Sequence, residues 1–285
     1  MKPIKVDILV TDRCQASGVF TVLDILIAAN FIARREQTIQ YDVFKLRLVG
    51  QSNQERAYNG YTLSPLDEIS KSSAPDVFII PGAFEAVLPS KMVVSQLEKY
   101  KSLLPILKKH QENGVLIASI CTGNFILAHL DLADGLALTC HWASKELVKE
   151  LFPKQEFNTQ KLILDHGNIV SAGGALSGAQ LTLYLIQRLI SRELAISTSK
   201  IMLVELQFDN QNRFSIFAPP KSHKDDLVLS LQENIEKNLS APLELSVYAS
   251  KKGISERHLS RRFKDVTGET PLSYLQKVRI EKVKT

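Results

Sequence analysis

LELSVYASKKGISERHLSRRFKDVTGETP, residues 243–271, is the most informative stretch of this chain. Apolar residues recur at helical spacing on both sides of Gly253, which predicts two short helices joined by a glycine turn. Ser255 is suited to cap the second helix, Gly268 to end it, and Pro271 to stand just inside the helix that follows. The stretch therefore predicts a helix-turn-helix unit. Its apolar positions are Leu245, Tyr248 and Ala249 before the turn and Leu259, Phe263 and Val266 after it.

The second predicted helix has a polar, basic face opposite its apolar stripe. An arginine there can bind the two acceptors of a guanine edge as a fork, and lysine or serine can hold phosphates. The alternative is that these charges only face solvent, as most runs of charged residues do. The glycine turn, the helix cap and the apolar stripe all occur at matching positions, and this favours a DNA-reading face. We therefore predict double-stranded DNA as a partner. The predicted DNA-binding residues are Ser255, Arg257, Ser260, Arg261 and Lys264.

Residues 223–285 also carry a dense motif that resembles the DNA-binding domain of AraC/XylS-type transcription regulators. Such domains normally contain two helix-turn-helix units joined by a long helix, and Leu272–Thr285 resembles that joining helix. No second unit follows in this sequence, and either a shortened form or a natural truncation would explain this. Dimerisation through the N-terminal region would then restore avidity. The motif consists of Ala249, Gly253, Ser255, Arg257, Leu259, Arg261, Phe263, Lys264, Thr267, Gly268, Pro271, Tyr274, Leu275, Arg279 and Ile280.

Length, composition and charge describe a soluble globular protein of two domains. The chain has 285 residues, of which 45% are hydrophobic and 23% are charged. From Lys221 onward there are thirteen Lys and Arg against nine Asp and Glu, so a net +4 of the total +5 lies in the last quarter. The basic end of the chain is therefore the predicted nucleic-acid end.

The sequence predicts a cytoplasmic protein with no membrane span, metal or cofactor. The apolar segment Val19–Ala33 is fifteen residues long and contains Asp24 and Asn30, so it falls short of a span of about 20 residues. A buried or subunit-facing helix is expected there. The three cysteines lack a C-x-x-C pair, and the histidines lack metal-ligand spacing. No phosphate-loop glycine motif occurs.

Strands alternate with helices through the first two thirds of the chain, which predicts an α/β domain with a mainly parallel, flavodoxin-like sheet. In such sheets ligands bind at the carboxyl ends of the strands. The expected strands are Ile4–Val10, Val43–Val49, Val77–Ile80 and Leu116–Ile120, and the expected helices are Val19–Ala33, Lys91–Asn113 with Pro105 as an interruption, and Ser177–Ile190.

Two strand ends are candidates for a ligand site. The run Pro81-Gly82-Ala83 follows one strand directly, where bare backbone N–H groups could face a ligand. The other strand delivers Cys121 onto a helix that begins near Thr122. An elbow of this kind places the thiol at the positive end of the helix, which lowers its pKa.

These elements resemble the PfpI-like branch of the class I glutamine amidotransferase-like superfamily over residues 1–195. A PfpI-like domain followed by an AraC-type domain is similar to the GlxA-like regulators, and the resemblance implies a small, nitrogen-containing effector near the elbow. The implied ligand residues are Gly82, Ala83, Cys121, Thr122, His141 and Trp142. The resembling motifs are Ser119–Gly123, Leu127–Gly135, Thr139–Trp142 and Val170–Gly174.

Catalysis by Cys121 is the alternative, as a cysteine-dependent hydrolase or hydratase. The resemblance implies His141 as the base, but Gly18 stands where the superfamily's enzymes have an acid, and Thr122 stands where the peptidases have histidine. We therefore predict sensing without turnover. Turnover, a ligand-lining or redox-sensing role, and inert packing all stay open for Cys121, as do ligand contact and core packing for His141 and Trp142.

The predicted domains are residues 1–195 and 223–285, joined by a linker over 196–222 that is interrupted by Pro219-Pro220. Leu227, Leu231, Ile235 and Leu239 predict an amphipathic helix behind the DNA-reading pair. A third possibility for the whole chain is a folded sensor that does not bind DNA.

Overall fold

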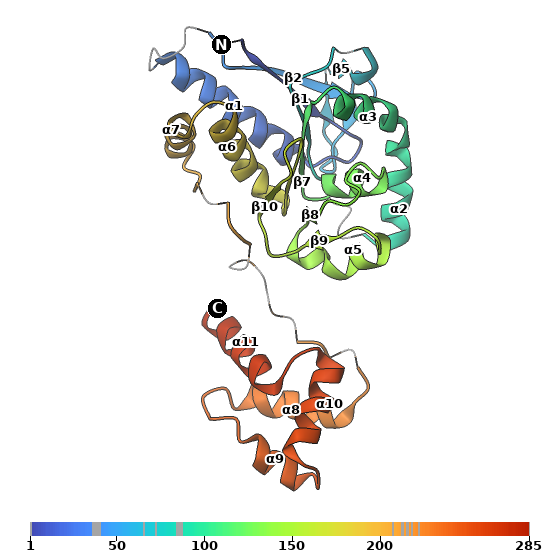
Figure 1. The fold of residues 1–285 in the computed structure, drawn as a ribbon, viewed down its shortest axis with the longest axis vertical. Coiled ribbons are helices and arrows are strands. Elements are labelled where there is room, and N and C mark those ends of the chain that lie inside the picture. The colour runs from blue at the N-terminus through green and yellow to red at the C-terminus, as the bar shows by residue number, and fades with distance from the viewer. Residues whose placement is uncertain are drawn as a thin grey trace. The chain divides into compact units, whose positions relative to one another are not determined.

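The structure, a computed structural model, describes residues 2–284 except 36–40, 65, 72, 84–87, 207, 212–213, 215–216, 218 and 222. It divides into two compact units, Met1–Arg213 and Phe214–Thr285. Figure 1 shows that the first unit is a sheet with helices on both faces and that the second is made of helices. The predicted order of an α/β domain followed by a helical region is confirmed.

The first unit is organised by a seven-stranded sheet in the order β10-β11-β7-β6-β1-β2-β5. All neighbouring pairs are parallel except the β10–β11 hairpin. The central strands β6 and β7 are fully buried and consist mostly of apolar residues, as is typical of strands covered on both faces. The strands are β1 Ile4–Leu9, β2 Phe44–Gly50, β5 Asp67–Glu68, β6 Val77–Ile80, β7 Leu116–Ile120, β10 Ile163–Asp165 and β11 Ile169–Ala172, with two small two-stranded sheets, β3 Glu55–Arg56 with β4 Thr62–Leu63 and β8 Leu138–Thr139 with β9 Phe157–Asn158.

One face of the sheet is covered by α1 (Ala16–Arg35), α6 (Gly178–Leu189) and α7 (Arg192–Met202). The 20-residue α1 is longer than predicted and has the length and composition of a membrane span, but nine of its residues are buried within the first unit. The side chain of Asn30 exchanges two 2.8 Å hydrogen bonds with the backbone of Phe44. This amide therefore anchors the start of β2, and α1 is a core helix.

The other face is covered by α2 (Ser90–Glu98), α3 (Leu104–Glu112), α4 (Gly123–His129) and α5 (Lys145–Leu151). The predicted helix 91–113 is interrupted, but by the 3₁₀ segment Lys99–Leu103 and not at Pro105. Pro105 lies in the first turn of α3, where its missing N–H has no helical partner to lose. Further 3₁₀ turns are Ile69–Lys71, Trp142–Ser144 and Ala175–Ser177.

The first unit extends beyond the predicted boundary at residue 195. That residue lies inside α7, which packs against α1 and α6 and ends at Leu203 in the left-handed conformation, φ 53°. Further along, the N–H of Gln211 donates to the carbonyl of Gln160 at 2.9 Å. The predicted linker 196–222 therefore begins too early, because its first part is built into the first unit.

The second unit contains α8 (Asp226–Lys237), α9 (Leu245–Lys251), α10 (Glu256–Thr267) and α11 (Pro271–Lys284). Its core forms around Phe263 and Tyr274, whose rings meet edge to face with centroids 5.4 Å apart. The Tyr274 hydroxyl donates to Glu236 at 2.6 Å, which gives the buried phenol its partner. The remaining core residues are Val228, Leu231, Ile235, Ala249, Leu259 and Leu275.

Candidate functional site

Helix α10 is fixed at both ends by local signals in the sequence. The Ser255 hydroxyl accepts the N–H of His258 at 3.2 Å, which satisfies one of the free donors at the helix start. Gly268 ends the helix at φ 78°, a conformation that glycine adopts without strain. Leu259 and Phe263 are fully buried on the inner side. The helix therefore presents a defined outer face.

The outer face of α10 carries exposed cations. Arg257, Arg261 and Lys264 are exposed, and within the described part of the chain none makes an ion pair or side-chain hydrogen bond. Ser260 is half-buried beside them. The structure therefore brings the predicted basic residues together on one accessible surface.

Arg262 behaves differently from its neighbours. Its Nε donates to a carboxylate oxygen of Asp225 at 2.7 Å. This hydrogen bond lowers the pKa of the Asp225 carboxyl. The other carboxylate oxygen accepts the N–H of Val228 at 3.1 Å and caps α8. Arg262 therefore holds α10 against α8.

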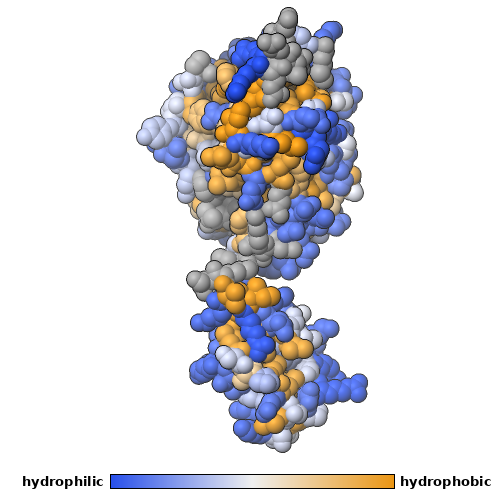
Figure 2. All heavy atoms as spheres, turned by 90° about the vertical axis from the view of Figure 1, so that its left-hand side faces the viewer, coloured by the Kyte–Doolittle hydropathy of each residue, from blue (hydrophilic) through white to orange (hydrophobic). Residues whose placement is uncertain are grey.

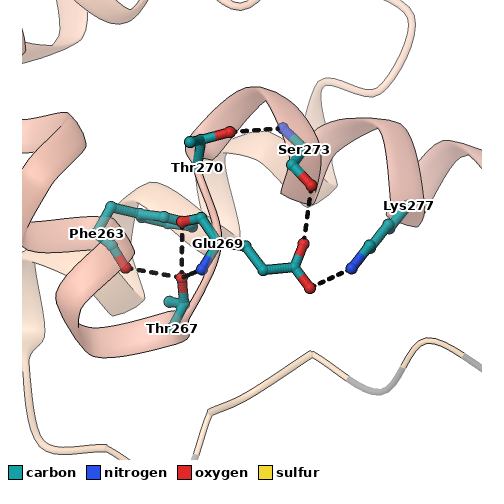
Figure 3. Close-up of polar contacts among 6 residues, drawn as sticks. All are labelled: Phe263, Thr267, Glu269, Thr270, Ser273 and Lys277. Carbon is teal, nitrogen blue, oxygen red and sulfur yellow. Dashed lines mark hydrogen bonds and ion pairs between the residues drawn. The ribbon is translucent and has the colours of Figure 1, made fainter. Parts of the chain in front are cut away.

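The turn between α10 and α11 is held by a polar cluster around Glu269 (Figure 3). The Thr267 hydroxyl donates to the carbonyl of Phe263 at 2.7 Å. The Glu269 carboxylate accepts from the Ser273 hydroxyl at 3.0 Å and pairs with Lys277. These contacts fix the exit of the chain from α10 and so the direction of the basic face.

The elbow after β7 is closely packed. Cys121 has φ 54°, a strained conformation for a residue with a side chain, and is 8% exposed. A Cβ at Gly123 would lie 2.5 Å from the carbonyl oxygen of Ile80, and one at Gly82 would lie 3.0 Å from Cβ of Cys121. Only glycine therefore allows the ends of β6 and β7 to approach this closely.

The polar groups beside Cys121 bind one another. The Thr122 hydroxyl donates to the carbonyl of Ala83 at 2.7 Å and lies 2.6 Å from the Ala83 nitrogen, whose N–H it accepts. The N–H of Ala83, predicted to be free for a ligand, is thus occupied. Asn124 donates to the carbonyls of Thr139 and Ala172, at 2.8 and 3.0 Å. The void next to Ala83 and Thr122 measures only about 10 Å³.

His141 and Trp142 form a half-buried ring pair with centroids 5.1 Å apart. Burial lowers the pKa of His141, so the ring is neutral at pH 7. Its Nδ1 accepts the N–H of Ala143 at 3.2 Å, which places the proton of the neutral ring on Nε2. No carboxylate pairs with His141 in the described part of the chain. The ring therefore lacks the orienting acid that a nucleophile's base needs.

Gln211 is a residue of this region that sequence reasoning missed. Its buried amide donates to the carbonyl of Cys140 at 2.8 Å and accepts the N–H of Trp142 at 3.2 Å. Gly173 makes room for it, because a Cβ there would lie 2.8 Å from the amide nitrogen. Burial also raises the pKa of the neighbouring Cys140 thiol to about 12. Gln211 lies in the predicted linker, where no local pattern marks a contact so distant in sequence.

Comparison with known families assigns both units. The DJ-1/PfpI family matches residues 5–188, and a helix-turn-helix domain matches residues 248–285. The chain belongs to the DJ-1/PfpI family. Its DJ-1/PfpI domain is followed by an AraC-type helix-turn-helix region, so the two resemblances found in the sequence are confirmed.

Relatives with this arrangement are transcriptional regulators. The HTH-type transcriptional regulator GbdR of Pseudomonas aeruginosa is 26% identical over 281 residues, covering 98% of this chain and 72% of GbdR. The regulator CdhR of the same species is 26% identical over 231 residues, covering 80% of this chain and 65% of CdhR.

Solved structures show the fold of the DJ-1/PfpI domain. An AraC family transcriptional regulator from Pseudomonas putida superposes with a TM-score of 0.56 at 17% identity, over 70% of this chain and all of that one. DJ-1beta of Drosophila melanogaster superposes with a TM-score of 0.57 at 17% identity, over 72% of this chain and all of that one.

Proposed function

We propose that this AraC-family regulator binds operator DNA in the cytoplasm through α10 and senses a small metabolite in its DJ-1/PfpI domain without turning it over. The observation that carries the proposal is the set of exposed cations Arg257, Arg261 and Lys264, which have no ion-pair partner among the described residues, on a helix capped at both ends. Each arginine can donate two hydrogen bonds to the major-groove edge of a guanine. The lysine and the hydroxyls of Ser255 and Ser260 can bind phosphates.

A homodimer would supply the second reading helix that strong binding requires, because affinity rises steeply with the number of phosphate contacts. Phe20, Ile27 and Phe31 form an exposed apolar ridge on α1. Figure 2 views the face bearing α1, α6 and α7, where hydrophobic residues gather on the first unit. We infer that this ridge is the subunit interface. Ile27→Asp should then give a monomer in sedimentation equilibrium, and an unchanged mass would contradict the assignment.

Band-shift titration with promoter DNA tests the reading face. Arg257→Ala and Arg261→Ala should each weaken binding by about 1–3 kcal/mol, and Lys264→Ala should reduce the slope of affinity against salt by about one. Lys237→Ala is the matched control, because Lys237 is an exposed lysine on α8 that pairs with Glu233. Unchanged binding in both arginine variants would show that another surface reads the DNA.

Cysteine-dependent hydrolysis or hydration is a second candidate, favoured by the strained elbow at Cys121. The isonitrile hydratase of Pseudomonas putida is 23% identical over 149 residues, covering 52% of this chain and 59% of that enzyme. Gly18 carries no acid, and the Nδ1 of His141 is engaged by Ala143, so the nucleophile lacks an activated base. Turnover of isonitriles that disappears in Cys121→Ser would establish this alternative over ligand sensing.

A further inference from the structure

A cavity of about 610 Å³ lies beside the carboxyl end of β1, outside the closely packed elbow. It is bounded by the segment after β1, by the β3–β4 hairpin and by α2. The carboxyl edge of a parallel sheet is where α/β domains bind ligands. Its lining includes Asp12, Arg13, Arg56, Tyr58, Met92 and Gln96.

Two guanidinium groups of the cavity have no carboxylate partner. The N–H of Arg13 donates to the carbonyl of Arg56 at 2.7 Å, so the two residues lie side by side. Neither side chain makes an ion pair within the described ranges, and the Arg13 guanidinium stands 5.3 Å from the centroid of the Tyr58 ring. Arg13 has φ 64°, which holds its backbone in an unusual conformation at this edge.

The other two charges of the cavity offset each other. Lys99 pairs with the carboxylate of Asp12 at 3.2 Å, so these two charges offset each other. The cavity therefore carries an excess of positive charge from Arg13 and Arg56. Because charge pairs interact more strongly away from bulk water, a partly enclosed anion is favoured here over one on an open surface.

Gln96 adds a neutral polar group to the wall of the cavity. Its side chain is 9% exposed and lines the cavity, yet its amide makes no hydrogen bond within the described part of the protein. An amide at a cavity wall is therefore available to bind water or a ligand there. The amide N–H₂ is a donor, as are the two guanidinium groups.

We propose that this cavity binds a small organic carboxylate. The carboxylate is held by Arg13 and Arg56 as forked donors and by the amide of Gln96, while its carbon skeleton packs on Tyr58 and Met92. The apolar components of the wall favour an organic acid over an inorganic anion. The inference rests on the proposed function, because it makes this cavity the effector site of the regulator.

The cavity is connected to the elbow through the backbone. Cys14, next to Arg13, forms a β-bridge with Ala83, and the N–H of Gln15 donates to the carbonyl of Gly82 at 2.9 Å. A ligand that draws Arg13 inward thus acts on the segment that packs against Cys121. The residues predicted as ligand contacts, Gly82 and Ala83, would then transmit the binding of the ligand instead of touching it.

Calorimetric titration of the full chain with hexanoate, hexanamide, hexylammonium and inorganic phosphate tests the charge and the class of the ligand. Hexanoate should bind with a dissociation constant on the order of 1 mM. The amide and the ammonium, which share its carbon chain, should bind at least tenfold more weakly. No binding of hexanoate, equal binding of the amide, or tighter binding of phosphate would each overturn the proposal.

Variants locate the binding site. Arg13→Gln, Arg56→Gln and the isosteric Gln96→Glu should each weaken hexanoate binding at least tenfold. Arg34→Gln is the control, since Arg34 is an exposed α1 arginine that pairs with Asp42. Circular dichroism and thermal melting of the free variants verify folding. Hexanoate binding that is unchanged in both arginine variants would refute the assignment to this cavity.

DNA binding measured on the same samples separates the two proposals. If the wild type shifts promoter DNA but does not bind hexanoate, the carboxylate inference fails alone. If it binds hexanoate but not DNA, the proposed regulatory function fails and the cavity assignment stands.

Discussion

Two short helices of this protein, α4 at the elbow and α10 in the second unit, make opposite use of their polar groups. Around the start of α4, Thr122 binds the backbone of the segment after β6 and Asn124 binds that of β8, and little space is left beside them. On α10 the Ser255 cap is engaged, but Arg257 and Arg261 reach solvent and pair with no residue that the structure describes. The difference indicates that the elbow is a scaffold, whereas α10 is a surface prepared for an anionic partner.

The largest effect is expected when the buried, apolar side of α10 is removed. Phe263→Ala removes a fully buried ring and should cost about 3–5 kcal/mol, enough to unfold a unit of this size. Urea titration followed by circular dichroism should show loss of the second unit with the first intact, and DNA binding should vanish. Val247→Ala, at a 45% exposed position on α9, should change little. Equal stability of the two variants would mean that α10 does not depend on this core.

Adding a side-chain atom at Gly123 tests whether the elbow is a closely packed scaffold. Gly123→Ala would place a Cβ 2.5 Å from the Ile80 carbonyl and should destabilise the first unit by about 1–3 kcal/mol. Gly18→Ala is the control, because the nearest atoms to its new Cβ would be 3.9 Å away. Thermal unfolding should separate the two variants, while DNA affinity below the transition stays at the wild-type value. A neutral Gly123→Ala would show that the elbow is looser than its geometry indicates.

The smallest expected effect concerns the ion pair that keeps Arg262 out of the reading face. Arg262 lowers the pKa of Asp225 in the folded state, so the carboxylate contributes stability above its unfolded pKa of about 3.9. That contribution is lost as pH falls through the lower folded value. Asp225→Asn keeps a capping side chain and should lose less stability at pH 7 than Asp225→Ala, whose lost cap costs about 1 kcal/mol.

Stability measured from pH 7 to pH 3 tests this assignment. The advantage of the wild type over Asp225→Asn should shrink as the pH falls below about 3.9. A constant difference between the two proteins across the range would show that the charge of Asp225 does not matter.

Much of the fold could be predicted from local patterns in the sequence. Apolar runs predicted the central strands, and Ser255 and Gly268 marked the ends of α10 within one turn. These features depend on neighbouring residues, so periodicity and capping chemistry reveal them.

The features that escaped prediction depend on distant parts of the chain. Helical spacing kept Arg262 off the predicted reading face, but no local pattern marked its partner Asp225, which lies 37 residues earlier. Arg13 and Arg56 meet because a positive φ turns the chain after β1 toward the hairpin. The end of the first unit was missed for the same reason, because Gln211 contacts Cys140, 71 residues earlier.

Gln211 sets the length of the tether between the two units. The chain is still fastened to the first unit at this residue, two positions before that unit ends. Residues 209–211 also pair through the backbone with residues 160–162, so release of this whole pairing is what would lengthen the chain between the two units. Because effective concentration falls as a connecting chain lengthens, the local concentration of the reading helices at a paired operator would then fall without any change in α10 itself.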